Sequence, residues 1–161
     1  MSLEQKINNL ETDLHIMGTL VLDSLVGAVR ALEDKDTLKA SEVMDKDDEI
    51  DDAYMKIDQD WFELMATEQP VASDLRLSTS ILQASLHLER LGDLSVYLGK
   101  TTHEIHDLPI PESLHKIVVE MGDMVIDMAS SALESLKNRD AELALSTARK
   151  DELSIVFTIR C

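Results

Sequence analysis

The sequence of 161 residues has few of the residues that build strands, tight turns or cross-links. Aromatic residues make up 3% of it, and there are five glycines and three prolines, so intrinsic preference favours helix almost everywhere. The one cysteine, Cys161, excludes an intramolecular disulfide, which fits a protein of the cytoplasm. No uninterrupted apolar run approaches the roughly 20 residues of a spanning helix, and the N-terminus has no basic, apolar leader. We therefore expect an all-α protein without a transmembrane segment.

Basic residues are the minority: 15 Lys and Arg stand against 32 Asp and Glu, a formal net charge of −17. Such a charge repels phosphate backbones and anionic lipids, so nucleic acid is not an expected partner. Hydrophobic residues, at 44%, suffice for a buried core. The surplus carboxylates attract cations or basic partner surfaces, unless they are a solubilising coat.

Apolar residues recur at steps of three and four through three long segments, residues 3–32, 38–69 and 71–103. Each segment predicts one amphipathic helix, and Pro70 sets the latest end of the second. Because propensity alone rarely holds a helix in water, the three apolar stripes must pack against one another. The pattern predicts a long antiparallel three-helix bundle over residues 1–106.

A linker and a second unit follow the bundle. Two prolines within residues 107–111 forbid helix continuation, so residues 112–161 start anew. Residues 121–140 match residues 17–36 at seven of twenty positions, 104 residues apart. This internal repeat is incomplete, because nothing in the second unit corresponds to the third helix of the first.

An incomplete repeat leaves apolar surface open. Either it folds back on the first unit or it pairs with another chain. We favour pairing, because exposed apolar surface of that extent normally marks an interface. Three apolar residues lie near its unfinished end: Val156, Phe157 and Ile159.

Two pairs of carboxylates are spaced to share a helix face. Asp47 and Asp51 on the second helix, and Glu89 and Asp93 on the third, are neighbours at i and i+4. Like charges at this spacing repel each other, and a hard cation or iron would relieve the repulsion. The alternative is that both pairs are solvated acidic faces that Lys or Arg side chains neutralise.

Three further aspartates are candidates for additional ligands or for supporting roles around such an ion. Asp48 adjoins the first pair, and Asp23 and Asp127 occupy equivalent places in the two repeats. The alternative is that Asp23 and Asp127 are ordinary polar-face residues.

Three ordered motifs make the chain similar to a known family. They are Asp47-Asp48-Glu49-Ile50-Asp51, Gln69-Pro70-Val71-Ala72-Ser73-Asp74-Leu75-Arg76 and Leu88-Glu89-Arg90-Leu91-Gly92-Asp93. Together with the repeat, they resemble the PhoU family, the regulators associated with bacterial and archaeal phosphate transport. The resemblance implies two repeats of three helices, a homodimer, and multinuclear metal sites on paired Glu/Asp-x-x-x-Asp motifs.

The resemblance also implies which residues hold metal and what the protein does. Asp47, Asp51, Glu89 and Asp93 match the ligand motifs, with iron or zinc expected and manganese or magnesium as alternatives. In the second repeat the matching segment, residues 150–154, has Lys and Ser where carboxylates are expected, so a second site should be absent or incomplete. The implied function is that of a non-enzymatic negative regulator. It would be cytoplasmic, or peripheral at the inner face of the membrane through a partner, and would contact a phosphate ABC transporter, its sensor histidine kinase, or both.

Two other functions stay open. One is a carboxylate-bridged di-metal enzyme or metal store on a helical bundle, for which Glu112 and His115 supply one Glu-x-x-His where two are needed, with two further glutamates. The other is a metal-free helical interaction module. His103 and His106 could bind zinc at a helix end, although ordinary solvent exposure is the plainer interpretation. No Ser-His-Asp set and no Gly-rich phosphate loop can be assembled, so catalysis is not expected.

Overall fold

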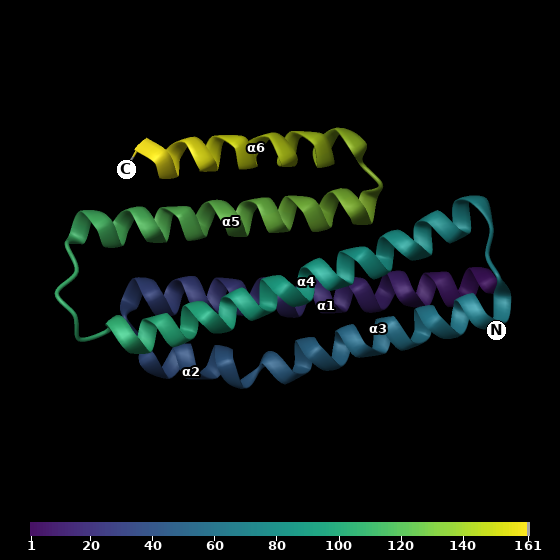
Figure 1. The fold of residues 1–161 in the computed structure, drawn as a ribbon, viewed down its shortest axis with the longest axis horizontal. Coiled ribbons are helices and arrows are strands. Elements are labelled where there is room, and N and C mark those ends of the chain that lie inside the picture. Colours follow the sequence, from purple (N-terminus) through teal and green to yellow (C-terminus); the bar gives the residue numbers. More distant parts are fainter. Residues whose placement is uncertain (161) are drawn as a thin grey trace.

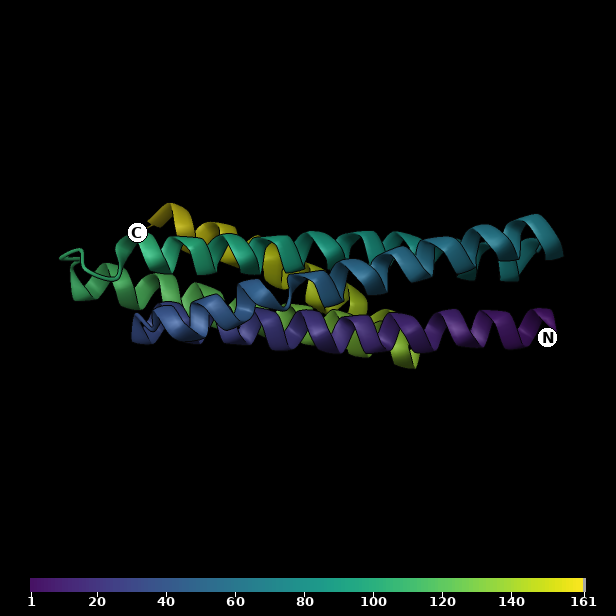
Figure 2. The same ribbon diagram turned by 90° about the horizontal axis from the view of Figure 1, so that it is seen from below.

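The fold consists of long helices that run along one common axis. The computed structural model describes the backbone of residues 1–160 and the side chains of residues 1–150. The helices, in chain order, are α1 (Leu3–Asp34), α2 (Thr37–Asp45), α3 (Asp47–Glu68), α4 (Ala72–Ile105), α5 (Glu112–Asn138) and α6 (Ala141–Arg160). Figure 1 shows α5 and α6 lying beside the bundle of α1 to α4, and Figure 2 shows the elongated shape. The predicted all-α class and helical-bundle fold are confirmed, although four helices, α1 to α4, stand where three were expected in the first unit.

Polar caps fix both ends of α1. Ser2 and Gln5 form a capping box at its start, in which each side chain accepts a hydrogen bond from the other's backbone N–H. At its end Lys35 adopts a left-handed conformation (φ 53°), and Asp36 then accepts hydrogen bonds from the first free N–H groups of α2. The chain therefore reverses over two residues, which makes α1 and α2 antiparallel neighbours.

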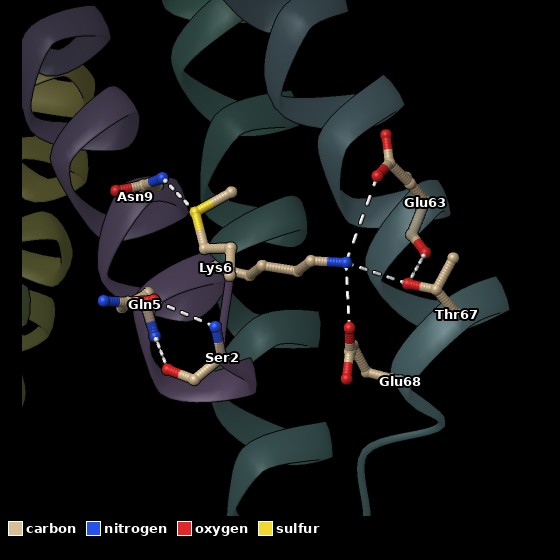
Figure 3. Close-up of polar contacts among 8 residues, drawn as sticks. Ser2, Gln5, Lys6, Asn9, Glu63, Thr67 and Glu68 are labelled. Atoms are coloured by element: carbon tan, nitrogen blue, oxygen red, sulfur yellow. Dashed lines mark hydrogen bonds and ion pairs between the residues drawn. The ribbon is translucent and has the colours of Figure 1, made fainter.

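A lysine joins the start of α1 to the end of α3. The Lys6 Nζ lies 2.9 Å from a carboxylate oxygen of Glu68, 4.0 Å from one of Glu63, and 3.0 Å from the Thr67 hydroxyl (Figure 3). Its side chain is only 18% exposed, so these charges interact more strongly than a fully solvated pair would. The contact fixes the register of α3 along α1.

The second predicted helix, residues 38–69, is in fact two helices, and this corrects the expectation from apolar spacing. The helix is interrupted at Lys46, the residue between α2 and α3, which has φ −90° and ψ −2°. Asp36 and Asp140 are 104 residues apart, whereas the Asp-Glu-Ile at residues 48–50 and the Asp-Glu-Leu at 151–153 are 103 apart. One extra residue turns every later side chain by about 100° around a continuous helix. The break absorbs that rotation and returns Ile50 to the core.

Small residues let α4 approach its neighbours closely. An ideal Cβ at Gly92 would lie 3.1 Å from Cγ2 of Ile50, and one at Gly99 would lie 3.2 Å from the carbonyl oxygen of Ala40. Ser85 and Ser95 are fully buried on the same helix, and their hydroxyls donate hydrogen bonds to backbone carbonyl groups of that helix. This stripe of small residues brings α4 against both α2 and α3.

The internal repeat is visible as a reciprocal contact between α1 and α5. An ideal Cβ at Gly18 would lie 2.7 Å from the Leu133 side chain, and one at Gly122 would lie 2.8 Å from the Val29 side chain. Gly18 and Gly122 are 104 residues apart, as are Val29 and Leu133, so the two contacts are related by a local two-fold axis. We term these four residues the inter-repeat seam.

The second repeat has an open apolar face. Three α1 residues that are at most 1% exposed have counterparts on α5, 104 residues later, that are 36–52% exposed. The pairs are Leu10 with Leu114, Leu14 with Val118, and Val21 with Val125. Among the described helices the backbone of α5 comes close only to α1 and α6, and α4 meets α5 through side chains alone, so α5 has no counterpart of the close α1–α4 contact. Pairing of this face with another chain stays a prediction, and Val156, Phe157, Ile159 and Cys161 lie outside the described side chains.

One helix resembles a membrane span by composition. α1 contains a window of mean hydropathy 1.4 that is long and apolar enough to cross a bilayer, and half of that window is buried in the protein. A helix at the centre of a bundle has the same composition, and α1 is central here because it packs against α2, α3, α4 and α5.

Candidate metal centre

The two acidic motifs approach each other where α3 meets α4. Ile50 is 1% exposed and packs against Gly92, where any larger residue would crowd it. Ile50 follows Asp47 by three residues and precedes Asp51, while Gly92 follows Glu89 by three residues and precedes Asp93. Residues three and four apart share a helix face, so each carboxylate pair flanks the same point of contact.

Burial and like charge both act on Asp47. Its side chain is half-buried at the start of α3. Partial desolvation raises the pKa of the Asp47 carboxyl above its ordinary value, and the negative charges of Asp51, Asp93 and Asp48 raise it further. Lys100 opposes this effect. The ionised Asp47 is therefore held close to other carboxylates at a cost in free energy.

Glu89 lies in the same field from the opposite helix. It is half-buried on α4, and partial desolvation raises its carboxyl pKa. The negative charges of Asp93, Asp51 and Asp47 raise this pKa further. Arg90 offsets part of the shift. Carboxylates of α3 therefore act on Glu89, and one of α4 acts on Asp47. The structure brings the four predicted ligands into one electrostatic cluster across the helix pair.

The donor set suits a cation that prefers oxygen ligands. Carboxylates are the usual protein ligands of magnesium and manganese, and iron and zinc also accept them. Among the side chains of residues 1–150, however, no three His, Cys, Asp or Glu groups close on one point that could hold an ion. Asp51 and Asp93 are exposed, which leaves their side chains free to turn toward a cation.

The three additional candidates lie in different surroundings. Asp48 is exposed and contributes to the field at Asp47. Asp23 lies on α1 and lines a separate cavity. Asp127 pairs with Lys150 at 2.7 Å. Neither Asp23 nor Asp127 is among the charges that shift Asp47 or Glu89.

The candidate histidines make contacts within the protein. His103 shares a hydrogen bond of 3.0 Å with the Ser41 hydroxyl, and His106 lies 2.9 Å from the Asp107 carboxylate. His115 Nε2 lies 2.9 Å from the carbonyl oxygen of Glu33 and so links the second repeat to the end of α1.

Sequence reasoning missed one charge at the cluster. Lys100 partly offsets the repulsion at Asp47, yet it was not among the candidate residues. It follows Asp93 by seven residues, two helical turns, so the spacing placed it on the same face of the helix.

Comparison with known proteins agrees with this architecture. Residues 14–102 match the family model of the PhoU domain. The chain is 33% identical over 147 residues to a Pseudomonas aeruginosa protein named phosphate-specific transport system accessory protein PhoU homolog, and 32% identical to its Pseudomonas putida counterpart. These alignments cover 91% of this chain but 61% and 57% of the two relatives, so the chain spans about three fifths of their length.

Two crystal structures have the same fold. PhoU from Pseudomonas aeruginosa superposes with a TM-score of 0.91 at 32% identity, covering 94% of this chain and 73% of that one. The phosphate transport system regulatory protein PhoU from Streptococcus pneumoniae gives a TM-score of 0.88 at 28% identity, covering 97% and 73%.

Proposed function

The chain belongs to the PhoU family, and on that premise we propose that it is a metal-binding regulator of phosphate uptake. It would act by protein contact on a phosphate ABC transporter, on the transporter's sensor kinase, or on both. The relatives are named accessory proteins of phosphate-specific transport, which supports a regulatory role over an enzymatic one. The proposed place of action is the cytoplasm, at the inner face of the membrane when a partner holds it there.

The observation that carries the metal proposal is the shared field of the two acidic motifs. Asp47 and Glu89 are half-buried on facing helices, and each has its pKa raised by burial and by carboxylates of the other helix. Such an arrangement destabilises the ionised, metal-free cluster. A divalent or trivalent cation would remove that cost by neutralising the charges.

A bound metal would also determine how the protein meets phosphate. With a net charge of −17, the metal-free chain repels a phosphate anion at long range. Any response to phosphate would therefore pass through the metal or through a partner protein. Tight binding of phosphate by the metal-free protein in calorimetry would contradict this part of the proposal.

The test is metal content by plasma mass spectrometry on untagged protein dialysed without chelator. We expect stoichiometric iron, zinc or manganese in the wild type and its loss in a Glu89→Ala/Asp93→Ala variant. A control is Asp52→Ala/Glu104→Ala, which also removes two carboxylates but takes one exposed residue from α3 and one from α4, outside the cluster. Substoichiometric metal in all three proteins would favour the metal-free interaction module. Oxygen consumption by the iron-loaded protein would favour the di-metal enzyme.

Partner contact is tested by co-purification with the transporter's ATPase subunit and with the kinase. We expect retention of at least one of them. The homodimer is tested separately by light scattering, with Val118→Glu on the open α5 face as the variant expected to shift the protein toward the monomer. Retention of neither partner, with the fold intact by circular dichroism, would refute the proposed mode of action.

A further inference from the structure

α3 carries apolar side chains on two opposite faces. Ile50, Ile57 and Leu64 recur every seven residues and are at most 1% exposed, because they pack in the core of the first repeat. Met55 and Phe62 are also seven residues apart, but each precedes a core residue by two, which turns it about 200° around the helix. They are 66% and 70% exposed. α3 therefore presents to solvent a second apolar stripe that its own bundle does not use.

The exposure of Phe62 is unusual for this sequence. Aromatic residues make up only 3% of it, and the neighbouring Trp61 packs against the core. A large apolar side chain left in water beside another on the same helix face is typical of a protein interface, where aromatic residues are enriched.

The second apolar stripe lies away from the second repeat. Among the described helices, the backbone of α3 comes close only to α1, α2 and α4. Figure 1 shows α3 along the edge of the molecule opposite α5 and α6. The exposure of the stripe therefore does not depend on what covers the open face of the second repeat.

α3 also carries about half of the net charge of the chain. It holds nine Asp and Glu residues and one lysine, a net charge of −8 within the −17 of the whole sequence. The lysine, Lys56, forms ion pairs with Asp60 and, across the helix pair, with Asp13 of α1. Its positive charge is therefore held on the α1 side of the helix, and the solvent side stays negative.

Two carboxylates flank the exposed apolar residues directly. Asp52 and Asp58 lie three residues before and three residues after Met55, and Asp58 lies four before Phe62, so the four share one face. Both aspartates are exposed, and neither takes part in an ion pair among the described side chains. We term Asp52, Met55, Asp58 and Phe62 the outer α3 stripe. It is complementary to a helix whose apolar residues are bordered by Lys or Arg.

The charge of the outer α3 stripe disfavours other occupants. A second copy that paired through it by two-fold symmetry would bring Asp52 and Asp58 against the same residues of its partner, and like charges repel. Nucleic acid and anionic lipid carry the same sign as the stripe. A neutral apolar segment would cover Met55 and Phe62 but would desolvate the carboxylates without pairing them.

From these observations we propose that the outer α3 stripe docks a cationic amphipathic helix of another protein. The bound helix lies along α3, and its apolar side chains at positions i and i+7 contact Met55 and Phe62, which are about 10.5 Å apart along the helix axis. Its Lys or Arg side chains pair with Asp52 and Asp58. This surface is independent of the proposed metal centre and of the homodimer.

The first experiment titrates the ¹⁵N-labelled full chain with synthetic peptides and follows its amide resonances. The probe is an amphipathic peptide of leucine, alanine and lysine, about 18 residues long so that it spans the stripe, with all leucines on one face. One control peptide has the same composition with its leucines scattered around the helix, and another has glutamate in place of each lysine. We expect the probe to shift resonances of residues 48–66 and to bind at least about tenfold more tightly than either control.

Apolar variants place the contact on the outer α3 stripe. Phe62→Ala should weaken binding of the probe at least about tenfold, and Met55→Ala about threefold. Leu38→Ala is the matched control, because it removes a leucine that is 78% exposed on α2, and it should leave binding unchanged. Circular dichroism and melting temperature verify that each variant folds, and Met55→Ala supplies the test if Phe62→Ala does not fold.

Charge variants test the pairing with Lys or Arg. Asp52→Asn/Asp58→Asn should weaken binding of the probe at least about threefold at low salt, with a smaller effect near 0.5 M NaCl. The matched control is Glu104→Gln/Glu134→Gln, which removes two exposed carboxylates from α4 and α5 and should leave binding unchanged.

Three results would overturn the proposal. The first is the absence of resonance shifts at residues 48–66 with millimolar probe. The second is a set of shifts confined to residues 112–128 and unaffected by Phe62→Ala, which would assign the peptide to the open face of α5. The third is a loss of self-association in light scattering, or of adsorption to phosphatidylglycerol vesicles, caused by Phe62→Ala, which would assign the stripe to a second copy or to a membrane.

Discussion

Gly122→Ala tests the packing of the second repeat on the first. In the inter-repeat seam, an alanine Cβ at position 122 would lie 2.8 Å from Cγ2 of Val29 and 2.9 Å from its Cγ1. The symmetry-related change, Gly18→Ala, would place a Cβ 2.7 Å and 3.0 Å from the two Cδ atoms of Leu133. The two new Cβ atoms lie at similar distances from their neighbours, but Val29 must move in one variant and Leu133 in the other.

The expected magnitudes follow from how freely each neighbour can move. Both glycines lie inside long helices, where alanine gains about 1 kcal/mol of helix propensity. Valine in a helix is held in one rotamer and Val29 is 1% exposed, so overpacking should cost about 1–3 kcal/mol. Leu133 is only half-buried and meets the new atom with its flexible end. We expect Gly122→Ala to destabilise by about 0–2 kcal/mol, and Gly18→Ala to be neutral or stabilising by up to about 1 kcal/mol.

Urea unfolding of the two variants measures these differences. In a double-mutant cycle, Gly122→Ala should be about 1 kcal/mol less destabilising when Val29→Ala is also present, because the smaller side chain makes room for the new Cβ. Val29→Ala combined with Gly18→Ala is the matched control, with near-additive effects expected. If Gly122→Ala stabilises by the full helix-propensity gain and shows no coupling to Val29, the two repeats do not pack through this seam.

Three further predictions concern charge and capping. In the metal-free protein, Asp47→Asn/Glu89→Gln should be more stable than the wild type. The difference in unfolding free energy should widen as pH rises from the ordinary pKa values of 3.8 and 4.5 through the raised pKa values, because ionising these carboxyls costs more in the folded state than in the unfolded state. A difference in urea unfolding that does not change with pH would contradict this. Asp36→Ala should lower the free energy of unfolding by about 1 kcal/mol, because it removes the cap of α2. Asp140→Ala should cost less, because the Asp140 carboxylate accepts one backbone hydrogen bond where that of Asp36 accepts two. Equal losses of stability in thermal melts would show that the number of cap hydrogen bonds does not decide the cost. Lys6→Met should cost about 0.5–1 kcal/mol at low salt and less in 1 M NaCl, and a cost independent of salt would assign the contribution of Lys6 to packing.

Helical periodicity predicted the long helices because their apolar stripes are regular. It missed the break at Lys46, since the apolar residues before and after the break each keep helical spacing. The signal was present in the repeat, where the first copy holds one residue more than the second between the capping aspartate and the Asp-Glu-Ile or Asp-Glu-Leu motif. Periodicity describes one helix at a time, and an insertion becomes visible only by comparing two copies.

The candidate site was predictable in part for the same reason. Spacing at i and i+4 indicates that Asp47 and Asp51 share a face, as do Glu89 and Asp93. It does not say that the two faces meet, which depends on Gly92 admitting Ile50. Equivalent places in the repeat suggested a common role for Asp23 and Asp127. The structure instead gives them different surroundings, because one lines a cavity and the other pairs with Lys150.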